Sequence, residues 1–273
     1  MSEAWRGAPN FVTVISDFVK RALTGDLHLP PWWLRDVGGS DFEATGREFL
    51  GHFVDLAGLR PDARVLEIGC GSGRMALPLS GFLNRNGAYT GIDITAPSIA
   101  WCQQHIARRH PNFQFRHADL YNKRYNPTGR VPARAYAFPF PDGSFDLVFL
   151  TSVFTHLLPE DTEHYVREIA RMLAPAGRAL LTFFLLNTTQ QQLAGQGRSD
   201  IGFGYAHDQY STRSDSVPES AVAYSESYVF GLLAACALEF HGPVRYGTWS
   251  GRADGLSYQD IIVVRHSPRE AGA

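Results

Sequence analysis

The sequence has few cysteines, no long apolar run and almost no net charge. Its three cysteines, Cys70, Cys102 and Cys236, form no CxxC pair and have no His-rich spacing, so neither a disulfide framework nor a zinc site is indicated. The formal net charge is −2, which creates no overall field that would attract nucleic acid or an anionic membrane surface. The apolar runs are far shorter than the roughly 20 residues that span a bilayer.

The N-terminus also lacks the basic stretch and apolar core of a signal peptide. Together with the isolated cysteines, this absence predicts a soluble, cytoplasmic protein. We expect no metal, no nucleic-acid partner and no membrane partner, while a homodimer stays open. What the sequence does contain is an ordinary globular composition, with 44% hydrophobic and 19% charged residues among 273, enough for one large domain with additions.

Short apolar runs alternate with helix-like segments along most of the chain. Strands are expected at 64–68, 88–94, 113–118, 145–150 and 178–186, and helices at 97–109 and 159–173. Several of these runs are apolar on both faces, as in parallel strands that helices cover on each side. The alternation therefore predicts a doubly wound α/β domain.

Additional elements are predicted before, within and after this alternation. Residues 10–24 are expected to form a helix, and a second one is expected to begin at a capping box of Ser40 and Glu43. Residues 1–42 are predicted to be an N-terminal helical lid, and 43–273 the main domain. Further predictions for that domain are polar insertions at about 121–137 and 187–224, a helix at 227–238 and a final strand pair.

A glycine-rich turn follows the first expected strand, in "VLEIGCGSG". Gly69, Gly71 and Gly73 stand at every second position, and such a turn lets a ligand approach the backbone closely. A dinucleotide fingerprint would require a glycine where Arg74 stands, and the Lys-Ser pair of a phosphate-binding loop is missing. The spacing therefore disfavours an NAD-dependent oxidoreductase.

Two aspartates mark the ends of the next two strands. Asp93 ends the second strand about 20 residues beyond the glycines, where a carboxylate can accept both hydrogens of a ribose diol. Asp119 ends the third strand, where it can accept a hydrogen bond from an adenine amino group. These positions predict an adenosyl ligand at the carboxyl edge of the sheet.

The motifs "VLEIGCGSG", "GIDI", "HADL", "FPDGSFDLVFLTSVFTHL" and "LAPAGRALLTFF" occur in this order over roughly residues 40–186. In this region the sequence resembles the class I S-adenosylmethionine-dependent methyltransferases. The resemblance implies a mostly parallel, seven-stranded Rossmann-like sheet and S-adenosyl-L-methionine as the cofactor. One departure is Ala176, since the usual "PGG" turn before the fifth strand is "PAG" here.

The resemblance also implies roles for individual residues around the cofactor. Gly69, Cys70 and Gly71 would line its methionine part, and Glu67 would fix the glycine turn. The remaining contacts would be Asp93 with the ribose, Ile94 over the adenine, Asp119 and Leu120 at the adenine edge, and the Thr151 carbonyl near the ammonium group. Cys70 is interpreted as a small space-filling side chain, because nothing near it in sequence would lower its pKa.

The leading functional prediction is O-methylation of a small molecule such as a sugar, glycoside or natural product. Aromatic and hydrogen-bonding side chains in the loops near the carboxyl edge suit such an acceptor. Those chosen as acceptor-binding candidates are Trp33, Phe42, Tyr210, Tyr224, Trp249 and Arg252. An N-methyltransferase for a small amine and a non-catalytic protein that binds S-adenosylmethionine remain alternatives. A nucleic-acid methyltransferase is disfavoured because "TSVF" stands where an "NPPY"-type tetrapeptide would grip a base.

A hydroxyl acceptor needs a base to take its proton. His156, just beyond the fourth strand, is the predicted catalytic residue, because a neutral imidazole with an ordinary pKa near 6.5 suits this task. The alternative interpretations are that His156 caps the helix that begins at Pro159 or that it packs under the cofactor. The base would then come from Asp161, His207, Tyr224 or the substrate itself.

Overall fold

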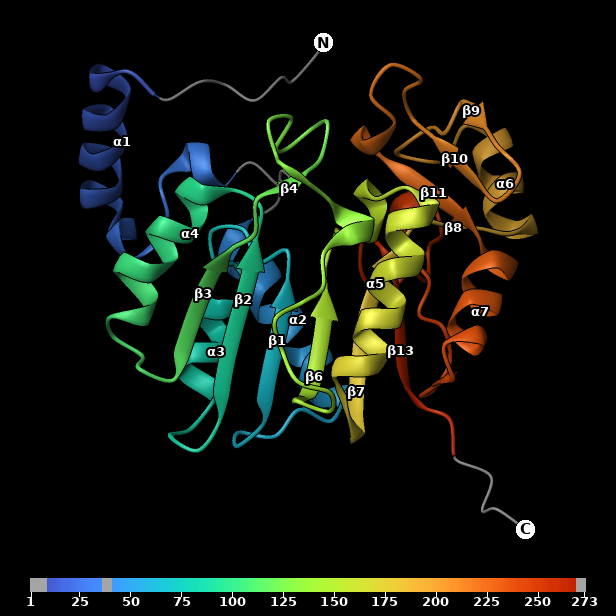
Figure 1. Cartoon of the computed structure of the whole chain (residues 1–273). Helices are drawn as coiled ribbons and strands as arrows, with labels where there is room; N and C mark the ends of the chain where they lie inside the picture. The colour runs from blue at the N-terminus through green and yellow to red at the C-terminus, as the bar shows by residue number, and fades with distance from the viewer. Residues whose placement is uncertain (1–8, 36–40, 269–273) are drawn as a thin grey trace.

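The computed structural model describes residues 9–35 and 41–268, which fold around a seven-stranded sheet (Figure 1). The strands are β1 (Arg64–Ile68), β2 (Ala88–Asp93), β3 (Phe113–His117), β6 (Phe145–Leu150), β7 (Leu173–Phe183), β12 (Leu238–Phe240) and β13 (Asp260–His266). Their order is β12-β13-β7-β6-β1-β2-β3. The strands from β7 to β3 are parallel, whereas β13 is antiparallel to β7 and β12. The predicted doubly wound, mostly parallel sheet is confirmed.

Helices cover both faces of the sheet because its central strands are apolar on both sides (Figure 1). In β1, Leu66 belongs to the core on one face and Val65 to the core on the other. The first core includes side chains of α5 (Pro159–Met172) and α7 (Glu226–Ala235). The second includes side chains of α2 (Phe42–Asp55), α3 (Ala76–Phe82) and α4 (Ala96–Cys102). The carboxyl edge of the sheet is thereby held rigidly between two packed layers.

The N-terminal arm contains α1 (Phe11–Thr24) and leads into α2. The predicted start of α2 needs correction, because its N-cap is Asp41, whose Oδ1 accepts hydrogen bonds of 3.0 Å from the backbone N–H groups of Glu43 and Ala44. Ser40, which was expected to be the cap, lies outside the described residues. Within the described ranges, no helix is long and apolar enough to cross a bilayer.

The junction between α5 and β7 also differs from the expectation. The "PAG" residues were predicted to form a turn before a strand at 178–186, but β7 begins at Leu173. The pairing with β6 shifts between Phe145↔Leu173 and Leu147↔Arg178, so the extra residues are absorbed as an irregularity within the strand. Two helices also differ from their predicted bounds. The helix expected at 97–109 consists of α4 followed by a π-helical turn, Gln103–Ala107, and the helix expected at 227–238 is α7, which ends at Ala235.

The segment 187–224, which was expected to be a polar excursion, contributes most of a second, small sheet (Figure 1). The strands of this sheet are β8 (Leu185–Leu186), β9 (Tyr205–Ala206), β10 (Tyr210–Thr212) and β11 (Val222–Ser225), and the helix α6 (Thr188–Gly195) follows β8 in the chain. The strand order is β8-β11-β10-β9. The insertion at 121–137 is less regular and follows β4 (Leu120–Tyr121), which pairs with β5 (Val131–Pro132).

Candidate active site

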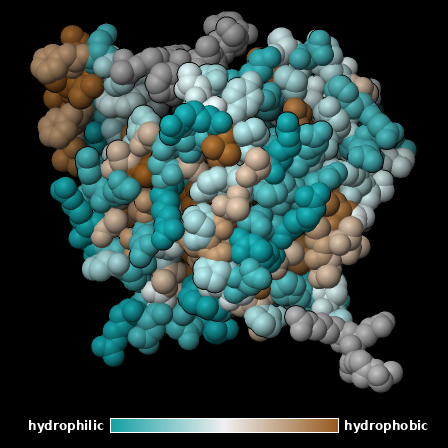
Figure 2. Space-filling model, in the orientation of Figure 1, coloured by the Kyte–Doolittle hydropathy of each residue, from teal (hydrophilic) through white to brown (hydrophobic). Residues whose placement is uncertain are grey.

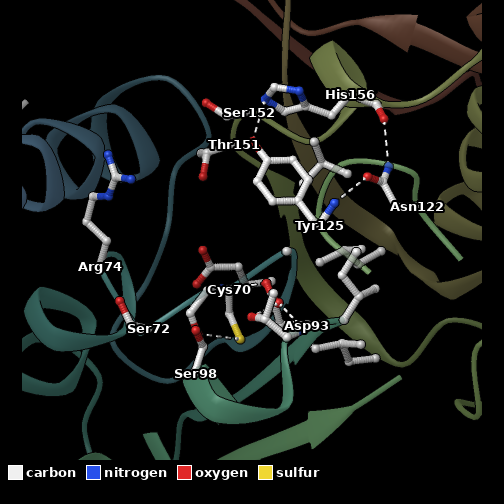
Figure 3. A pocket seen from close by; sticks show the side chains of 18 of the residues that line it. Cys70, Ser72, Arg74, Asp93, Ser98, Asn122, Tyr125, Thr151, Ser152 and His156 are labelled. Atoms are coloured by element: carbon white, nitrogen blue, oxygen red, sulfur yellow. Dashed lines mark hydrogen bonds between the residues drawn. The ribbon is translucent and has the colours of Figure 1, made fainter. Parts of the chain in front are cut away.

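A pocket lies at the carboxyl ends of β1, β2 and β6, with a cavity of about 370 Å³ (Figure 3). Its walls come from the glycine turn after β1, from the segments after β2, β3 and β6, and from residues 33–35 of the N-terminal arm. Parallel strands end at the same edge of a sheet, so residues distant in sequence meet there. The size is at the lower end of the range for small-molecule sites.

The glycine turn forms the floor of this pocket through backbone conformations that favour glycine. Gly69 and Gly71 have φ angles of 86° and 49°. A Cβ atom on Gly69 would come within 2.3 Å of Val153 Cγ2, whereas a Cβ atom on Gly71 would meet no atom within 4 Å. The backbone N–H groups of Gly69 and Cys70 both donate to the Ile92 carbonyl, at 2.7 and 3.0 Å. Gly71 is therefore the residue whose missing side chain leaves space inside the pocket.

Asp93 lies at the end of β2, as predicted, and its carboxylate contacts the glycine turn. Oδ2 accepts a hydrogen bond of 2.7 Å from the Gly71 N–H, while Oδ1 accepts from the backbone and hydroxyl of Thr95 at 2.7 and 2.5 Å. A carboxylate offers about four acceptor positions. Asp93 therefore has capacity for one ribose hydroxyl as it stands, and the second would replace the Thr95 hydroxyl.

Glu67 is buried at the end of β1 and lines the pocket. Its hydrogen-bond partner is the Tyr89 hydroxyl on β2, rather than the glycine turn that it was expected to fix. Burial raises the pKa of Glu67 to about 8, with the nearby charge of Asp93 adding to the rise. Arg74, which also lines the pocket, opposes that rise through its charge. Glu67 thus links β1 to β2 beneath the pocket.

Cys70 has the space-filling role that the sequence suggested. Its side chain is buried within the second core, and burial raises the pKa of the thiol well above its ordinary value. A thiol with a raised pKa stays protonated at neutral pH and is a poor nucleophile. The part of Cys70 that serves the pocket is its place in the glycine turn.

The segment after β6 supplies another wall. Thr151 lines the pocket, as predicted, and so do Ile94 and Leu120 from the segments after β2 and β3. Ser152, which the sequence did not single out, has a φ of 60°, and its N–H donates to Thr182 Oγ1 at 2.8 Å. Non-glycine residues held in this conformation are concentrated at functional sites.

His156 projects into the same pocket from a short 3₁₀ turn, Phe154–His156 (Figure 3). Its Nδ1 lies 2.8 Å from the Glu219 carbonyl oxygen, and because a carbonyl only accepts, Nδ1 carries the hydrogen. Nε2 therefore has the lone pair, and it accepts a hydrogen bond of 3.2 Å from the Tyr125 hydroxyl. The His156 carbonyl accepts from Asn122 Nδ2 at 3.1 Å, which fixes the turn.

The surroundings of His156 change its acidity. Burial is the main cause that lowers the pKa of His156, to about 4. The hydrogen bond to the Glu219 carbonyl raises the pKa by a smaller amount, and the charge of Arg124 lowers it. The surroundings therefore hold the pKa of His156 below the ordinary value near 6.5 that the sequence alone suggests. His156 is neutral throughout the physiological range, which keeps its lone pair available but makes it a weaker base.

Asp119 is not brought into the pocket with the other predicted cofactor residues. Its carboxylate accepts hydrogen bonds from Arg130 Nε at 2.5 Å and from Asn126 Nδ2 at 3.3 Å. The pairing with Arg130 lowers the pKa of Asp119, so it stays ionised in that pair. Its predicted contact with adenine would require this arrangement to open, whereas the neighbouring Leu120 reaches the pocket directly.

The six acceptor-binding candidates divide into two groups. Trp33 and Phe42, both from the N-terminal part of the chain, line the pocket. The others, Tyr210, Tyr224, Trp249 and Arg252, do not. The expected role in binding the acceptor therefore has no support from the pocket for these four residues.

Each of the four residues outside the pocket contacts the protein itself. Tyr224 is buried, where its hydroxyl donates to the Leu157 carbonyl at 2.7 Å and lies 2.9 Å from Thr162 Oγ1. Trp249 is also buried, and its Nε1–H donates to Asp260 Oδ2 at 2.9 Å. The further contacts are Tyr210 with the rings of His207 and Tyr224, and Arg252 over the Tyr246 ring.

The residues of the pocket fit the cofactor that the sequence resemblance implies. Gly71 leaves a bare cradle, and Asp93 provides an acceptor for a hydroxyl. Arg35 and Arg74 place two cations on the wall, which suits the carboxylate of an amino-acid group. The sequence did not identify Arg35, Arg74, Asn122 or Tyr125 as site residues. Arg74 could have been inferred from its place directly after the glycines, but the inward direction of Asn122 and Tyr125 has no local signal.

Known proteins are similar to this chain mainly over the region that contains the glycine turn and the strands around the pocket. Residues 66–181 match a family model described as a methyltransferase domain. A 27-O-demethylrifamycin SV methyltransferase from Amycolatopsis mediterranei is 33% identical over 153 residues, which cover 54% of this chain and 49% of that protein. Phosphoethanolamine N-methyltransferase 3 of Arabidopsis thaliana is 27% identical over 147 residues, covering 54% of this chain and 26% of that protein. The chain thus spans a quarter to a half of the length of such curated relatives.

Solved structures show the same fold at lower sequence similarity. One is the 1,6-didemethyltoxoflavin-N1-methyltransferase of Burkholderia thailandensis with bound 1,6-didemethyltoxoflavin and S-adenosylhomocysteine. It superposes with a TM-score of 0.54 at 16% identity, over 96% of this chain and 94% of that one. The common architecture extends beyond residues 66–181 to almost the whole chain.

Proposed function

The chain belongs to the class I S-adenosylmethionine-dependent methyltransferase family, and on that premise we propose that it methylates a hydroxyl oxygen of a small organic molecule. The observation that carries this proposal is the orientation of His156. Its Nδ1 is held by the Glu219 carbonyl, so the lone pair of Nε2 faces Tyr125 inside the pocket. A fixed acceptor of this kind is what the loss of a hydroxyl proton requires.

The chain's own residues would bind and align the two reactants. When bound, S-adenosylmethionine supplies a methyl group on a positively charged sulfur. Gly71 and Asp93 would hold the adenosyl part, and Arg35 or Arg74 would pair with its carboxylate. Trp33 and Phe42 would exclude water from the shared cavity. Alignment of this kind can lower a barrier by up to about 7–11 kcal/mol, which makes orientation the largest contribution.

His156 would then accept the proton of the acceptor hydroxyl on Nε2. In the described structure the Tyr125 hydroxyl occupies this lone pair, so the acceptor has to replace it. The resulting imidazolium would be held through Nδ1 by the Glu219 carbonyl. The cavity of about 370 Å³ must hold both reactants, which favours a compact acceptor.

An amine acceptor is the alternative within the family. A relative named phosphoethanolamine N-methyltransferase and one named 27-O-demethylrifamycin SV methyltransferase are both similar to this chain, so relatives' names favour neither atom. An amine that is unprotonated when it reacts needs little help from a base. The neutral, well-positioned His156 therefore favours a hydroxyl acceptor over an amine. The other alternative, a protein that binds the cofactor without catalysis, is excluded only by measuring turnover.

The experiment that tests the proposal is a screen of small alcohols, sugars, glycosides and amines with methyl-labelled S-adenosylmethionine. Mass spectrometry of the products identifies both the acceptor and the methylated atom. We expect an O-methylated product from the wild-type protein and a loss of turnover in His156→Ala. An N-methylated product whose formation does not depend on His156 would replace the proposal with the amine alternative.

A further inference from the structure

Helix α1 and the turn that follows it carry an unusual concentration of exposed apolar side chains. Sixteen large apolar residues of the described chain are substantially exposed, and nine of them fall within residues 11–32. They are Phe11, Val12, Val14, Ile15, Phe18, Val19, Leu23, Leu27 and Trp32. Figure 2 shows the corresponding hydrophobic cluster at the upper left, where Figure 1 places α1. We call these nine residues the α1 face.

The polar side of the helix contacts residues 29–32, which follow it in the chain. Asp17 is buried, where it accepts from Arg21 Nε at 2.6 Å and from the Trp32 N–H at 3.3 Å. Arg21 also donates to the Leu29 carbonyl at 2.8 Å. An amphipathic helix on a globular protein normally turns its apolar stripe inward. Here Asp17 and Arg21 point inward whereas Lys20 is exposed, and the α1 face is left without a partner in the described structure.

The size of the α1 face matches one side of a protein–protein interface. Its nine side chains are each between 40% and 83% exposed. Their exposed fractions are equivalent to about five fully exposed side chains. Six of the nine residues are the smaller Val, Ile or Leu, so we take roughly 150 Å² each, the lower end of the range for aromatic side chains, which gives on the order of 800 Å². The largest apolar patch of a typical monomer is about 300–600 Å², whereas a standard interface buries about 800 Å² on each partner. The α1 face is therefore large enough to form one whole side of an interface with a second protein.

The chemistry of the α1 face narrows the choice of partner. Residues of an α-helix are about 100° apart, and on this basis Asp17, Lys20 and Arg21 fall outside the apolar arc. A partner therefore meets no charge on the arc that would select an oppositely charged surface, and it must itself be apolar. A second copy of this chain presents such a surface of equal size, and a two-fold axis places identical patches against each other.

We propose that the α1 face is the surface through which two copies of this chain associate, with α1 packed antiparallel against α1 of the second copy. The pairing would bury Phe18 near the two-fold axis, because it lies near the middle of the helix. The flanking Leu27 and Trp32 widen the contact beyond a single helix seam. The pairing rests on the exposed face alone and does not depend on the methyl-transfer reaction.

The association would also brace one wall of the pocket. Pro9, two residues before the start of α1, lines the pocket, and so do residues 33–35 after the helix. Asp17 holds the backbone of Trp32, and the Leu34 carbonyl accepts from Ser72 Oγ of the glycine turn at 2.7 Å. Restraining α1 therefore restrains residues next to the cradle. This consequence rests on the proposed cofactor site, and we expect tighter binding of S-adenosylhomocysteine by the dimer.

The test measures the mass of the full chain by sedimentation or light scattering over a range of concentrations. The wild-type chain should be a dimer that dissociates on dilution, and the double variant Phe18→Glu/Leu23→Glu should be a monomer. Leu256→Glu is the matched control, since Leu256 is 45% exposed but is not part of the α1 face, and this variant should remain dimeric. A second double variant, Phe18→Leu/Leu23→Met, keeps the face apolar and should also remain dimeric.

Three results would overturn the proposal. The wild-type chain could be monomeric at every concentration, the dimer could survive the Glu substitutions, or the chain could bind neutral phosphatidylcholine vesicles as a monomer. Calorimetry with S-adenosylhomocysteine separates this question from the enzymatic one. A wild-type dimer that binds no S-adenosylhomocysteine would leave the α1 pairing intact and contradict the proposed function.

Discussion

The glycine turn between β1 and β2 and the small sheet formed by β8 to β11 differ in how their residues relate to the pocket. At the glycine turn, Gly69, Gly71 and Asp93 lie where the sequence placed them. In the small sheet, Tyr210 and Tyr224 were expected to bind the acceptor and instead pack against the protein. Both regions are close to the carboxyl edge of the main sheet, so proximity does not explain the difference.

The difference lies in what the local sequence specifies. A glycine with a positive φ constrains the backbone itself, and the backbone of a turn after a strand can only face the sheet edge. An aromatic residue in a loop can turn its ring to the pocket or to the core, and it gains more by burial in the core. Motifs built on backbone geometry are therefore more reliable guides to a site than an abundance of aromatic residues.

The largest effect is expected from Gly71→Val. The new side chain would project into the pocket from a residue with a φ of 49°, so binding of S-adenosylhomocysteine should be lost in calorimetry. Gly197→Val is the matched control, because Gly197 has a φ of 70° and equally open space but does not line the pocket. Normal binding by Gly71→Val, or equal loss in both variants, would remove the turn from the role of cradle.

The next largest effect is expected from His156→Ala. Loss of the base should lower kcat by about 10²-fold or more, with cofactor affinity nearly unchanged. Since burial holds the pKa of His156 at about 4, wild-type kcat should rise with pH through about 4 and not change between pH 5 and 8 on account of this residue. A histidine-dependent limb near pH 6.5 in the pH–rate profile would contradict the described surroundings.

Tyr125→Phe sharpens the assignment of His156. The variant removes the hydroxyl that occupies Nε2 while leaving the ring in place. If the acceptor only has to displace this hydroxyl, kcat should be retained or raised in steady-state assays. A fall as large as that of His156→Ala would show that the Tyr125 hydroxyl itself takes part in proton transfer.

A smaller effect is expected from Asp93→Asn. Loss of a charge-assisted hydrogen bond of about 1.5–3 kcal/mol should weaken S-adenosylhomocysteine binding at least tenfold. Asp119→Asn is the comparison, because Asp119 pairs with the exposed Arg130 and does not line the pocket, so its affinity for S-adenosylhomocysteine should be nearly unchanged. Equal losses in the two variants would restore the predicted contact between Asp119 and adenine.

The smallest kinetic effect is expected from Tyr224→Phe. This change removes a buried hydroxyl that contacts Thr162 and Leu157, so thermal or denaturant unfolding should show about 1–3 kcal/mol of lost stability. The KM for the acceptor should stay the same. Trp33→Ala should do the opposite, raising KM or weakening cofactor binding with little change in stability. A raised KM in Tyr224→Phe would return Tyr224 to the site.

Much of the main sheet was predictable from the sequence. The strand at residues 64–68 and the helix that begins at Pro159 agree with the structure, because each is marked by local apolar periodicity and a recognisable start. The small sheet was not predicted, because its strands are two to four residues long. Such short strands carry no periodic signal and depend on pairing partners far away in the sequence.

The sequence by itself determined the turn after β1, the acid at the end of β2 and the resemblance to the class I methyltransferases. These features follow from residue type and spacing, which act through the local backbone. The tertiary structure alone decided which side chains face the pocket. It turned His156 and Tyr125 toward each other, paired Asp119 with Arg130 and left the apolar side of α1 exposed. Side-chain direction in loops is set by competition among distant partners, and no short stretch of sequence contains that information.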